Sequence, residues 1–324
     1  MNWLITGGCG FIGTSLIKTL LQENNQHNIR VLDNLTTGTR EDLAIACEYR
    51  EIQPEQAGSA PEGVELIVGD ILNEKLATQI SHNIDVIVHL AANTGVGPSV
   101  ENPRADCLAN VMGTFNYLEA ARINQIPRFI FASSGAPAGE VEPPIHEELP
   151  PHPVSPYGAS KLAGEGYCSA YNKTFGINTV MLRFGNVYGP GSLHKSSVVA
   201  KFIRQALNQE TLEIYGDGTQ TRDFIYIDDL INALMLSATT ENIGGEAFQI
   251  ASNQETTVGE ITEKIVTILQ KNGITDITTV NGETRLGDVK RNYSDTSKAK
   301  NRLGWQPTMT QEEGLKRTIK YFIK

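Results

Sequence analysis

The strongest constraint on the fold is a glycine-rich turn near the start of the chain. Residues 2–6 form a short apolar run that predicts a buried strand, and residues 14–22 repeat apolar side chains at helical spacing. Between them stand Gly7, Gly10 and Gly13. In a strand, turn and helix of this kind, the glycines permit a tight turn, close approach to a pyrophosphate, and close packing of the helix on the strand. The N–H groups that begin the helix attract phosphates, so the segment predicts a nucleotide-binding α/β fold.

A second predicted strand ends in an acid at the distance expected for such a fold. Residues 29–33 form this strand, and Asp33 lies twenty residues after Gly13. A carboxylate at this place accepts hydrogen bonds from the adenosine ribose and repels a 2′-phosphate, so the pattern favours NAD over NADP. An ordinary acid at a strand end is the alternative interpretation.

Three further apolar runs predict strands that lead into small or polar residues. These runs are residues 64–68, 85–90 and 128–132. Asp70, Ala91 and Ser134 stand just after them, where the ligands of a parallel sheet bind. The predicted fold class is therefore α/β, with a Rossmann-type doubly wound parallel sheet. His89 is interpreted as a strand-end histidine, because no second His or acid stands at metal-ligand spacing, and no metal site is predicted.

The composition of the 324 residues narrows the classes of function. The net charge is -10, which argues against a general nucleic-acid or anionic-membrane surface. Four cysteines form no C-x-x-C pair, so neither a zinc site nor a disulfide framework is indicated. No run approaches the ~20 apolar residues of a membrane span, and the first residues lack the basic flank of a signal peptide. We expect a soluble, cytoplasmic protein.

A tyrosine and a lysine four residues apart form the candidate catalytic pair. Ser155 suits a helix N-cap and Pro156 suits the first helical position, so a helix is predicted to start here. On that helix Tyr157 and Lys161 lie on one face. A tyrosine titrates near ~10, and a neighbouring ammonium lowers the pKa of the phenol toward the range in which its phenolate serves as a base. For this pair alone, an ordinary surface Tyr and Lys is the alternative.

In combination, the motifs resemble those of the extended short-chain dehydrogenase/reductases, and within them the nucleotide-sugar epimerase and dehydratase group. The resemblance covers nearly the whole chain. Its motifs are Gly7-Gly8-x-Gly10-Phe11-Ile12-Gly13, Asp33-Asn34-Leu35, Gly69-Asp70-Ile71, His89-Leu90-Ala91-Ala92, Ser133-Ser134 and Ser155-Pro156-Tyr157-Gly158-x-Ser160-Lys161. It implies an NAD-binding Rossmann domain at residues 1–176 and a smaller C-terminal α/β substrate lobe at residues 177–324, with some segments crossing back to the first domain.

The resemblance also implies a role for each matching residue. Ser134, Tyr157 and Lys161 would be catalytic, with Tyr157 as the acid/base. The NAD-binding residues would be Gly7, Gly10, Phe11, Ile12, Gly13, Asp33, Asn34, Asp70, Ile71, Leu90, Ala91, Ala92, Tyr157 and Lys161. The residues that bind a nucleotide-diphosphate sugar would be Ser134, Asn186, Tyr215, Arg222, Arg285 and Asp288. In this arrangement the tyrosine stacks on the base, the two arginines hold the diphosphate, and the last acid holds the ribose.

The implied reaction is inversion of a sugar C4 through a transient 4-keto intermediate. Dehydratase and decarboxylase relatives carry acids just after the equivalent of Ser134, whereas this chain has no acid in residues 135–139, so epimerisation of a UDP-sugar is favoured. Ala138 and Asn292 predict a pocket with room for an N-acetyl or carboxylate group. The alternatives are a nucleotide-sugar dehydratase or reductase, and a non-catalytic NAD-binding scaffold. A homodimer through helices near residues 103–123 and 157–175 is implied by resemblance.

Overall fold

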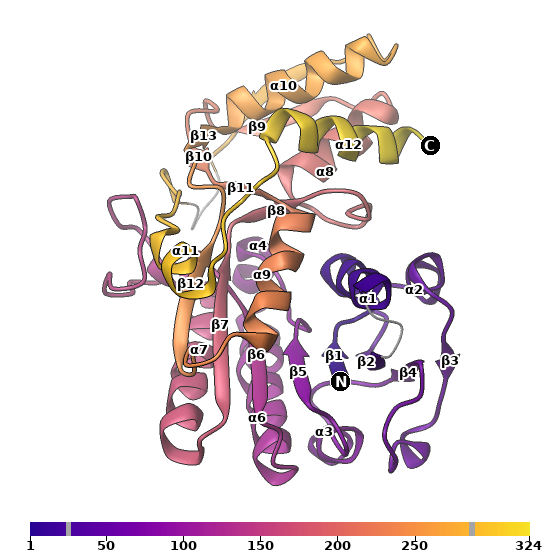
Figure 1. Ribbon diagram of the computed structural model, residues 1–324. Helices are drawn as coiled ribbons and strands as arrows, with labels where there is room; N and C mark the ends of the chain where they lie inside the picture. The colour runs from indigo at the N-terminus through magenta and orange to yellow at the C-terminus, as the bar shows by residue number, and fades with distance from the viewer. Residues whose placement is uncertain (24–26, 285–288) are drawn as a thin grey trace.

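The chain folds around a doubly wound parallel sheet, which confirms the predicted fold class. A computed structural model describes residues 1–23, 27–284 and 289–324. The strands of the large sheet are β1 Asn2–Thr6, β2 Asn28–Asp33, β3 Arg50–Glu51, β4 Val64–Val68, β5 Val86–His89, β6 Arg128–Ser134, β7 Asn178–Phe184 and β12 Glu246–Ile250. Within the described residues, these eight strands pair in the order β12-β7-β6-β5-β1-β2-β4-β3 (Figure 1). The order reverses beside β1, which is where a doubly wound sheet opens a crevice at its carboxyl edge.

Successive residues of each strand point to opposite faces of the sheet, so both faces carry apolar side chains. Helices cover both faces. The helical segments are α1 Phe11–Glu23, α2 Arg40–Ala46, η1 Pro54–Gln56, α3 Glu74–Ile80, α4 Val96–Glu101, α5 Pro103–Cys107, η2 Leu108–Met112, α6 Gly113–Ile123, η3 Ala136–Ala138, α7 Pro156–Phe175, α8 Val198–Leu207, α9 Ile227–Thr239, α10 Val258–Lys271, α11 Ser297–Leu303 and α12 Gln311–Ile323. Trp3 and Ile5 of β1 pack into the core that α1 and α9 share. Leu4 points the other way, into the core that α3, α6 and α7 share.

The second half of the chain adds a smaller group of strands and helices above the carboxyl edge of the sheet (Figure 1). Its strands are β8 Asn186–Tyr188, β9 Leu212–Tyr215, β10 Thr221–Arg222, β11 Phe224–Tyr226, β13 Thr256–Thr257 and β14 Thr279–Gly282. They form the pairs β8 with β11, β9 with β14, and β10 with β13. Strands β7 and β12 also come from this half, yet they extend the large sheet beside β6. The division into two domains at residue 176 stays a prediction.

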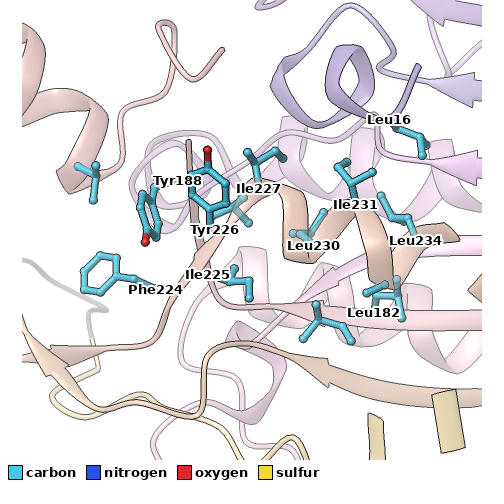
Figure 2. Close-up of a cluster of buried hydrophobic side chains, with 14 of the residues drawn as sticks. Leu16, Leu182, Tyr188, Phe224, Ile225, Tyr226, Ile227, Leu230, Ile231 and Leu234 are labelled. Carbon is cyan, nitrogen blue, oxygen red and sulfur yellow. The ribbon is translucent and has the colours of Figure 1, made fainter. Parts of the chain in front are cut away.

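Helix α9 joins the two groups of strands through one continuous core. Figure 2 shows its side chains Leu230, Ile231 and Leu234 between Leu182 of β7 and Leu16 of α1. Helix α9 follows β11 directly. At the start of α9, the same core includes the aromatic residues of β8 and β11. The packing therefore fixes the smaller group of strands over the edge of the large sheet. None of the described helices has both the length and the apolar character needed to cross a membrane.

Candidate active site

A cleft of about 1160 Å³ opens at the carboxyl edge of the large sheet, and both halves of the chain line it. Its volume exceeds the range typical of a pocket for one drug-sized molecule, so it has room for a dinucleotide and a second ligand. Among the lining residues are Gly7, Gly10, Phe11, Ile12, Gly13, Asp33, Asn34, Asp70, Ile71, Leu90, Ala91, Ala92, Ser134, Tyr157, Lys161, Asn186, Tyr215 and Arg222. Two predicted substrate residues, Arg285 and Asp288, lie outside the described residues.

The glycine-rich turn has the shape that a bound pyrophosphate requires. Gly7 has a φ of 71°, and a Cβ at this position would lie 2.8 Å from the backbone nitrogen of Ala91. A Cβ on Gly13 would lie 2.5 Å from the Cα of Gly8. Glycine is thus required where the turn packs against the backbone after β5 and against itself, and helix α1 begins at this turn with its free N–H groups. The turn fits a dinucleotide.

Two acids, Asp33 and Asp70, stand at the ends of β2 and β4, and hydrogen bonds fix their carboxylates. Asp33 accepts hydrogen bonds from the backbone N–H groups of Cys9 and Leu35, both at 2.9 Å. Burial raises the pKa of Asp33, while these two bonds oppose the rise. Asp70 follows the neighbouring strand β4, and its carboxylate accepts a hydrogen bond from the Asn34 side-chain amide at 3.3 Å. Both carboxylates face the cleft, as expected for contacts to the adenosine half of NAD.

The predicted catalytic residues come together as the sequence suggests. Ser155 caps helix α7 by accepting a hydrogen bond from Gly158 N, so the helix begins at Pro156. One turn later, the Lys161 ammonium is buried, donates to the carbonyl of Ala132 at 2.8 Å, and lies 6.0 Å from the centroid of the Tyr157 ring. Ser134, which β6 delivers to the cleft, lies close enough to the Tyr157 hydroxyl to lower the pKa of that phenol.

The expected lowering of the tyrosine pKa is not found in the protein, and this prediction is wrong for the protein alone. Burial raises the pKa of Tyr157 to about 12; the Ser134 hydrogen bond lowers it and the charge of Asp106 raises it further. Burial also lowers the pKa of Lys161 to about 8, with Asp106 and Glu165 opposing. Removing water penalises the phenolate and the ammonium alike. The ammonium therefore does not outweigh the desolvation of its neighbour.

A buried asparagine behind the candidate catalytic pair was not predicted as a site residue, because the sequence pattern there indicates only the start of a helix. Asn110 lies in η2, a π-helical segment of the kind that recurs at functional sites. Its side-chain amide donates to Asn93 O at 2.9 Å, to Asp106 at 2.9 Å and to Ser160 at 3.0 Å. Its carbonyl accepts from Asn93 N at 2.8 Å. The amide thus ties the loop after β5 to helix α7 beside Lys161.

A second group missed by the sequence analysis is a buried ion pair. Glu165 lies one helical turn after Lys161 and accepts two hydrogen bonds from Arg183, at 2.8 and 2.7 Å. The same carboxylate accepts from Ser133 at 2.5 Å. Helix α7, β7 and the end of β6 are therefore joined next to the candidate catalytic serine, Ser134. Forked contacts of this kind fix orientation as well as distance.

The substrate end of the cleft is built by the second half of the chain. Asn186 begins β8, and its N–H donates to Asp223 O at 2.7 Å. Tyr215 ends β9 with the Lys201 ammonium 4.9 Å from its ring centroid. The Arg222 guanidinium donates to the carbonyls of Val289 and Thr221, at 2.9 and 2.6 Å. Aromatic, cationic and amide groups therefore meet where a nucleotide is expected.

The two residues predicted to make room for the sugar, Ala138 and Asn292, differ in whether they line the cleft. Asn292 lines the cleft, and its side-chain oxygen lies 3.5 Å from the place of a Cβ on Gly135. Ala138 is buried in η3 and does not line the cleft among the described residues, because the turn directs Ala136 and Gly139 there instead. Ala138 therefore supplies no space beside the sugar.

His89 is part of the buried core. Its Nδ1 pairs with the Thr6 hydroxyl at 2.9 Å, and its ring stacks on Tyr117 at 5.4 Å. Burial lowers the pKa of His89 to about 3, so the ring is neutral. Among the described residues, no group of three His, Cys, Asp or Glu side chains could hold a metal ion.

The fold and the site together define an enzyme of the short-chain dehydrogenase/reductase type. A doubly wound sheet presents a glycine-rich turn and a strand-end acid to a dinucleotide, while Ser134, Tyr157 and Lys161 face the same cleft. Known proteins support this class. A model of the NAD dependent epimerase/dehydratase family matches residues 3–251.

Relatives match over nearly their whole length. The UDP-glucose 4-epimerase of Mycolicibacterium smegmatis is 32% identical over 327 residues, which cover 99% of this chain and 98% of that protein. The crystal structure of a UDP-glucose 4-epimerase with UDP-glucose from Thermotoga maritima has a TM-score of 0.88 at 33% identity, covering 100% of this chain and 99% of that one. The dTDP-glucose 4,6-dehydratase of Haemophilus influenzae is 30% identical over 345 residues, covering 100% of this chain and 98% of that protein. The chain belongs to the NAD-dependent epimerase/dehydratase family, and its cofactor is NAD.

Proposed function

We propose that this chain is a NAD-dependent epimerase that inverts C4 of a UDP-sugar through a transient 4-keto sugar. The observation that carries the proposal is the meeting of Ser134, Tyr157 and Lys161 in a cleft where, among the described residues, no acid lines the wall directly after the serine. Epimerases and dehydratases of the family share the serine, tyrosine and lysine, so the surroundings of the serine distinguish the two reactions. UDP-sugars are proposed because the epimerases similar to this chain act on them.

Each catalytic side chain has one task in this reaction. Tyr157 removes the proton of the C4 hydroxyl and returns it to the inverted alcohol. Ser134, already in hydrogen-bond contact with that phenol, holds the sugar oxygen while it is a carbonyl. Lys161, fixed by the Ala132 carbonyl, provides the positive charge next to the phenolate. Bound NAD would supply the hydride acceptor and donor, together with the positive charge of its oxidised ring.

The distribution of carboxylates in the cleft favours epimerisation over dehydration. Elimination of water needs a further proton carrier near the reacting carbons. Among the described lining residues, the carboxylic acids are Asp33, Asp42, Asp70 and Glu213. Three belong to the cofactor half and the fourth lies on β9 beside Tyr215, so none of them follows Ser134. A simple cycle of oxidation and reduction at C4 needs no such group.

Asn292 supports tolerance of an enlarged sugar. It faces Gly135, and neither residue fills the cleft with an aromatic ring. We propose that an N-acetyl or carboxylate substituent is accommodated there. Turnover of the unsubstituted hexose alone, with UDP-N-acetylglucosamine and UDP-glucuronic acid both rejected, would contradict this part of the proposal.

The experiment that tests the function uses the purified protein with a panel of UDP-, dTDP-, CDP- and GDP-sugars and no added cofactor. NMR follows the H4 and anomeric signals, and mass spectrometry follows the product. We expect inversion at C4 without a change in mass for one or more UDP-sugars. A product lighter by one water would identify a dehydratase, and a reduced product would identify a reductase. A protein that binds NAD and converts no sugar would favour the scaffold.

We also propose a homodimer formed by the helices on one face of the sheet. Met112 of η2 and Tyr167 of α7 each expose about two-fifths of their surface, at 45% and 41%. Phe115 of α6, three residues after Met112, contacts the Tyr167 ring edge-on, with 5.4 Å between the ring centroids. Met112 and Tyr167 therefore present an apolar patch on neighbouring helices, and exposed apolar patches are a feature of subunit interfaces. Light scattering after gel filtration is expected to give twice the chain mass at micromolar concentration.

The matched variant for the dimer is Met112→Glu, with Ile45→Glu as its control on the exposed face of α2. The first is expected to give a monomer and the second a dimer, because only the first puts a charge into the apolar patch. A monomeric wild-type protein would contradict the proposed dimer.

A further inference from the structure

The segment between β8 and α8 reaches from the substrate half of the cleft to the cofactor half. We call residues 189–197 the connector. A Cβ at Gly191 would lie 3.4 Å from the Phe11 ring, and His194 lies 3.4 Å from Asp42 of α2. Figure 1 shows the corresponding loop extending from β8 toward α1 and α2. The connector therefore lies against the glycine-rich turn, although it belongs to the other half of the chain.

Within the connector, Lys195 places an ammonium in the cleft without an acidic partner. Its Nζ donates to the carbonyl of Val187 at 3.3 Å and lies 5.5 Å from the centroid of the Phe11 ring. Among the described residues, no carboxylate forms an ion pair with it, and burial alone lowers its pKa to about 8. The Lys195 side chain is half-buried, and a half-buried ammonium without a carboxylate partner is stabilised by an anion. The site therefore favours a negatively charged ligand.

Two helix N-termini lie at the same part of the cleft. Helix α1 begins at Phe11, and α8 begins at Val198 with Ser197 as its N-cap. The Ser197 hydroxyl is buried and has no hydrogen-bond partner among the described residues. Free N–H groups in the first turns of both helices add positive potential to that of Lys195. In a chain with a net charge of -10, such a local concentration of donors and positive charge fits a polyanion.

We propose that Lys195 binds a diphosphate group within the cleft, between the glycine-rich turn and the start of α8. Two molecules of the reaction carry this group: NAD and, if the proposed substrate class is correct, the sugar nucleotide. The chemistry is the same for both, since a diphosphate accepts hydrogen bonds from an ammonium, a serine hydroxyl and helix N–H groups. Binding across the connector would also bring the two halves of the chain together around the ligands.

The test compares Lys195→Met with Lys195→Arg and with the control Lys300→Met, which removes an exposed lysine of α11. The methionine keeps the packing on Phe11 and removes the charge, whereas the arginine keeps the charge. Two quantities are measured on the protein as purified: the NAD that remains bound after extended dialysis, and the affinity for UDP by calorimetry. Lys195→Met is expected to weaken the binding of NAD, of UDP or of both by about tenfold, because it removes one charge-assisted hydrogen bond. Lys195→Arg and Lys300→Met are expected to stay within about twofold of the wild type.

The pattern of loss identifies the source of the diphosphate. Loss of UDP affinity alone assigns Lys195 to the sugar nucleotide, loss of NAD alone assigns it to the cofactor, and loss of both assigns it to the two together. Unchanged binding of NAD and UDP in Lys195→Met overturns the proposal. If that variant fails to fold by thermal unfolding, Lys195→Gln replaces it under the same criteria, since it retains a hydrogen-bond donor for Val187 O. A wild-type protein that binds UDP but converts no sugar would contradict the proposed function and leave this comparison valid.

Discussion

At the level of single residues, the proposed reaction depends on the phenol of Tyr157, which burial has made a weaker acid. Because burial raises the pKa of Tyr157 to about 12, the protein alone does not generate a phenolate at neutral pH. The hydrogen bond of Ser134 opposes this rise, while the charge of Asp106 adds to it. The proposed role of Tyr157 as the base therefore requires that bound substrate and cofactor favour its charged form.

Tyr157→Phe tests this role directly. The variant is expected to lose turnover by at least about a hundredfold, since it removes the acid/base while keeping the ring. Its retained NAD, measured after denaturation, is expected to match the wild type. Comparable turnover in the variant would remove Tyr157 from the mechanism.

Asp106→Asn tests the electrostatics behind the catalytic pair. The carboxylate of Asp106 raises the pKa of Tyr157 and also that of Lys161, whose other neighbours include Glu165 and Cys168. Removing the charge therefore lowers both pKa values, and the pH profile of kcat/KM is expected to move toward lower pH by about one unit. A profile that moves toward higher pH, or stays in place with the activity retained, would contradict this assignment.

At the scale of elements, local signals identify the strands and helices, whereas distant contacts complete the site. The start of α7 is predictable because Ser155 and Pro156 are neighbours in sequence and act within one turn. The role of Asn110 cannot be predicted in this way, because its partners Asn93 and Ser160 come from other parts of the chain. The same is true of Glu165, whose partner Arg183 lies on a strand eighteen residues away.

Helix α9 is the element that joins the two groups of strands, so its core face should matter for stability. Leu230→Ala removes a fully buried side chain and is expected to lower the free energy of unfolding by about 2–5 kcal/mol. Asn232→Ala, on the exposed face of the same helix, is expected to change it by less than about 0.5 kcal/mol. Chemical denaturation measures both, and equal effects would show that this face does not carry the packing.

At the scale of the whole molecule, the cleft belongs to neither half of the chain alone. The first half supplies the glycine-rich turn and the candidate catalytic residues, while the second half supplies Asn186, Tyr215 and Arg222. The sequence resemblance indicates both groups, but it does not indicate that the connector lies against the cofactor half. That contact depends on how α9 fixes the smaller group of strands, which no local pattern reports.

The central claim is that hydride leaves C4 of the sugar and returns to the same carbon on the opposite face. The most direct measurement supplies UDP-glucose carrying deuterium at C4 and follows the label in the product by NMR and mass spectrometry. The account predicts UDP-galactose that retains the deuterium at C4, with no change in mass and no net production of NADH. Loss of the label to solvent, or a product lighter by one water, would contradict it.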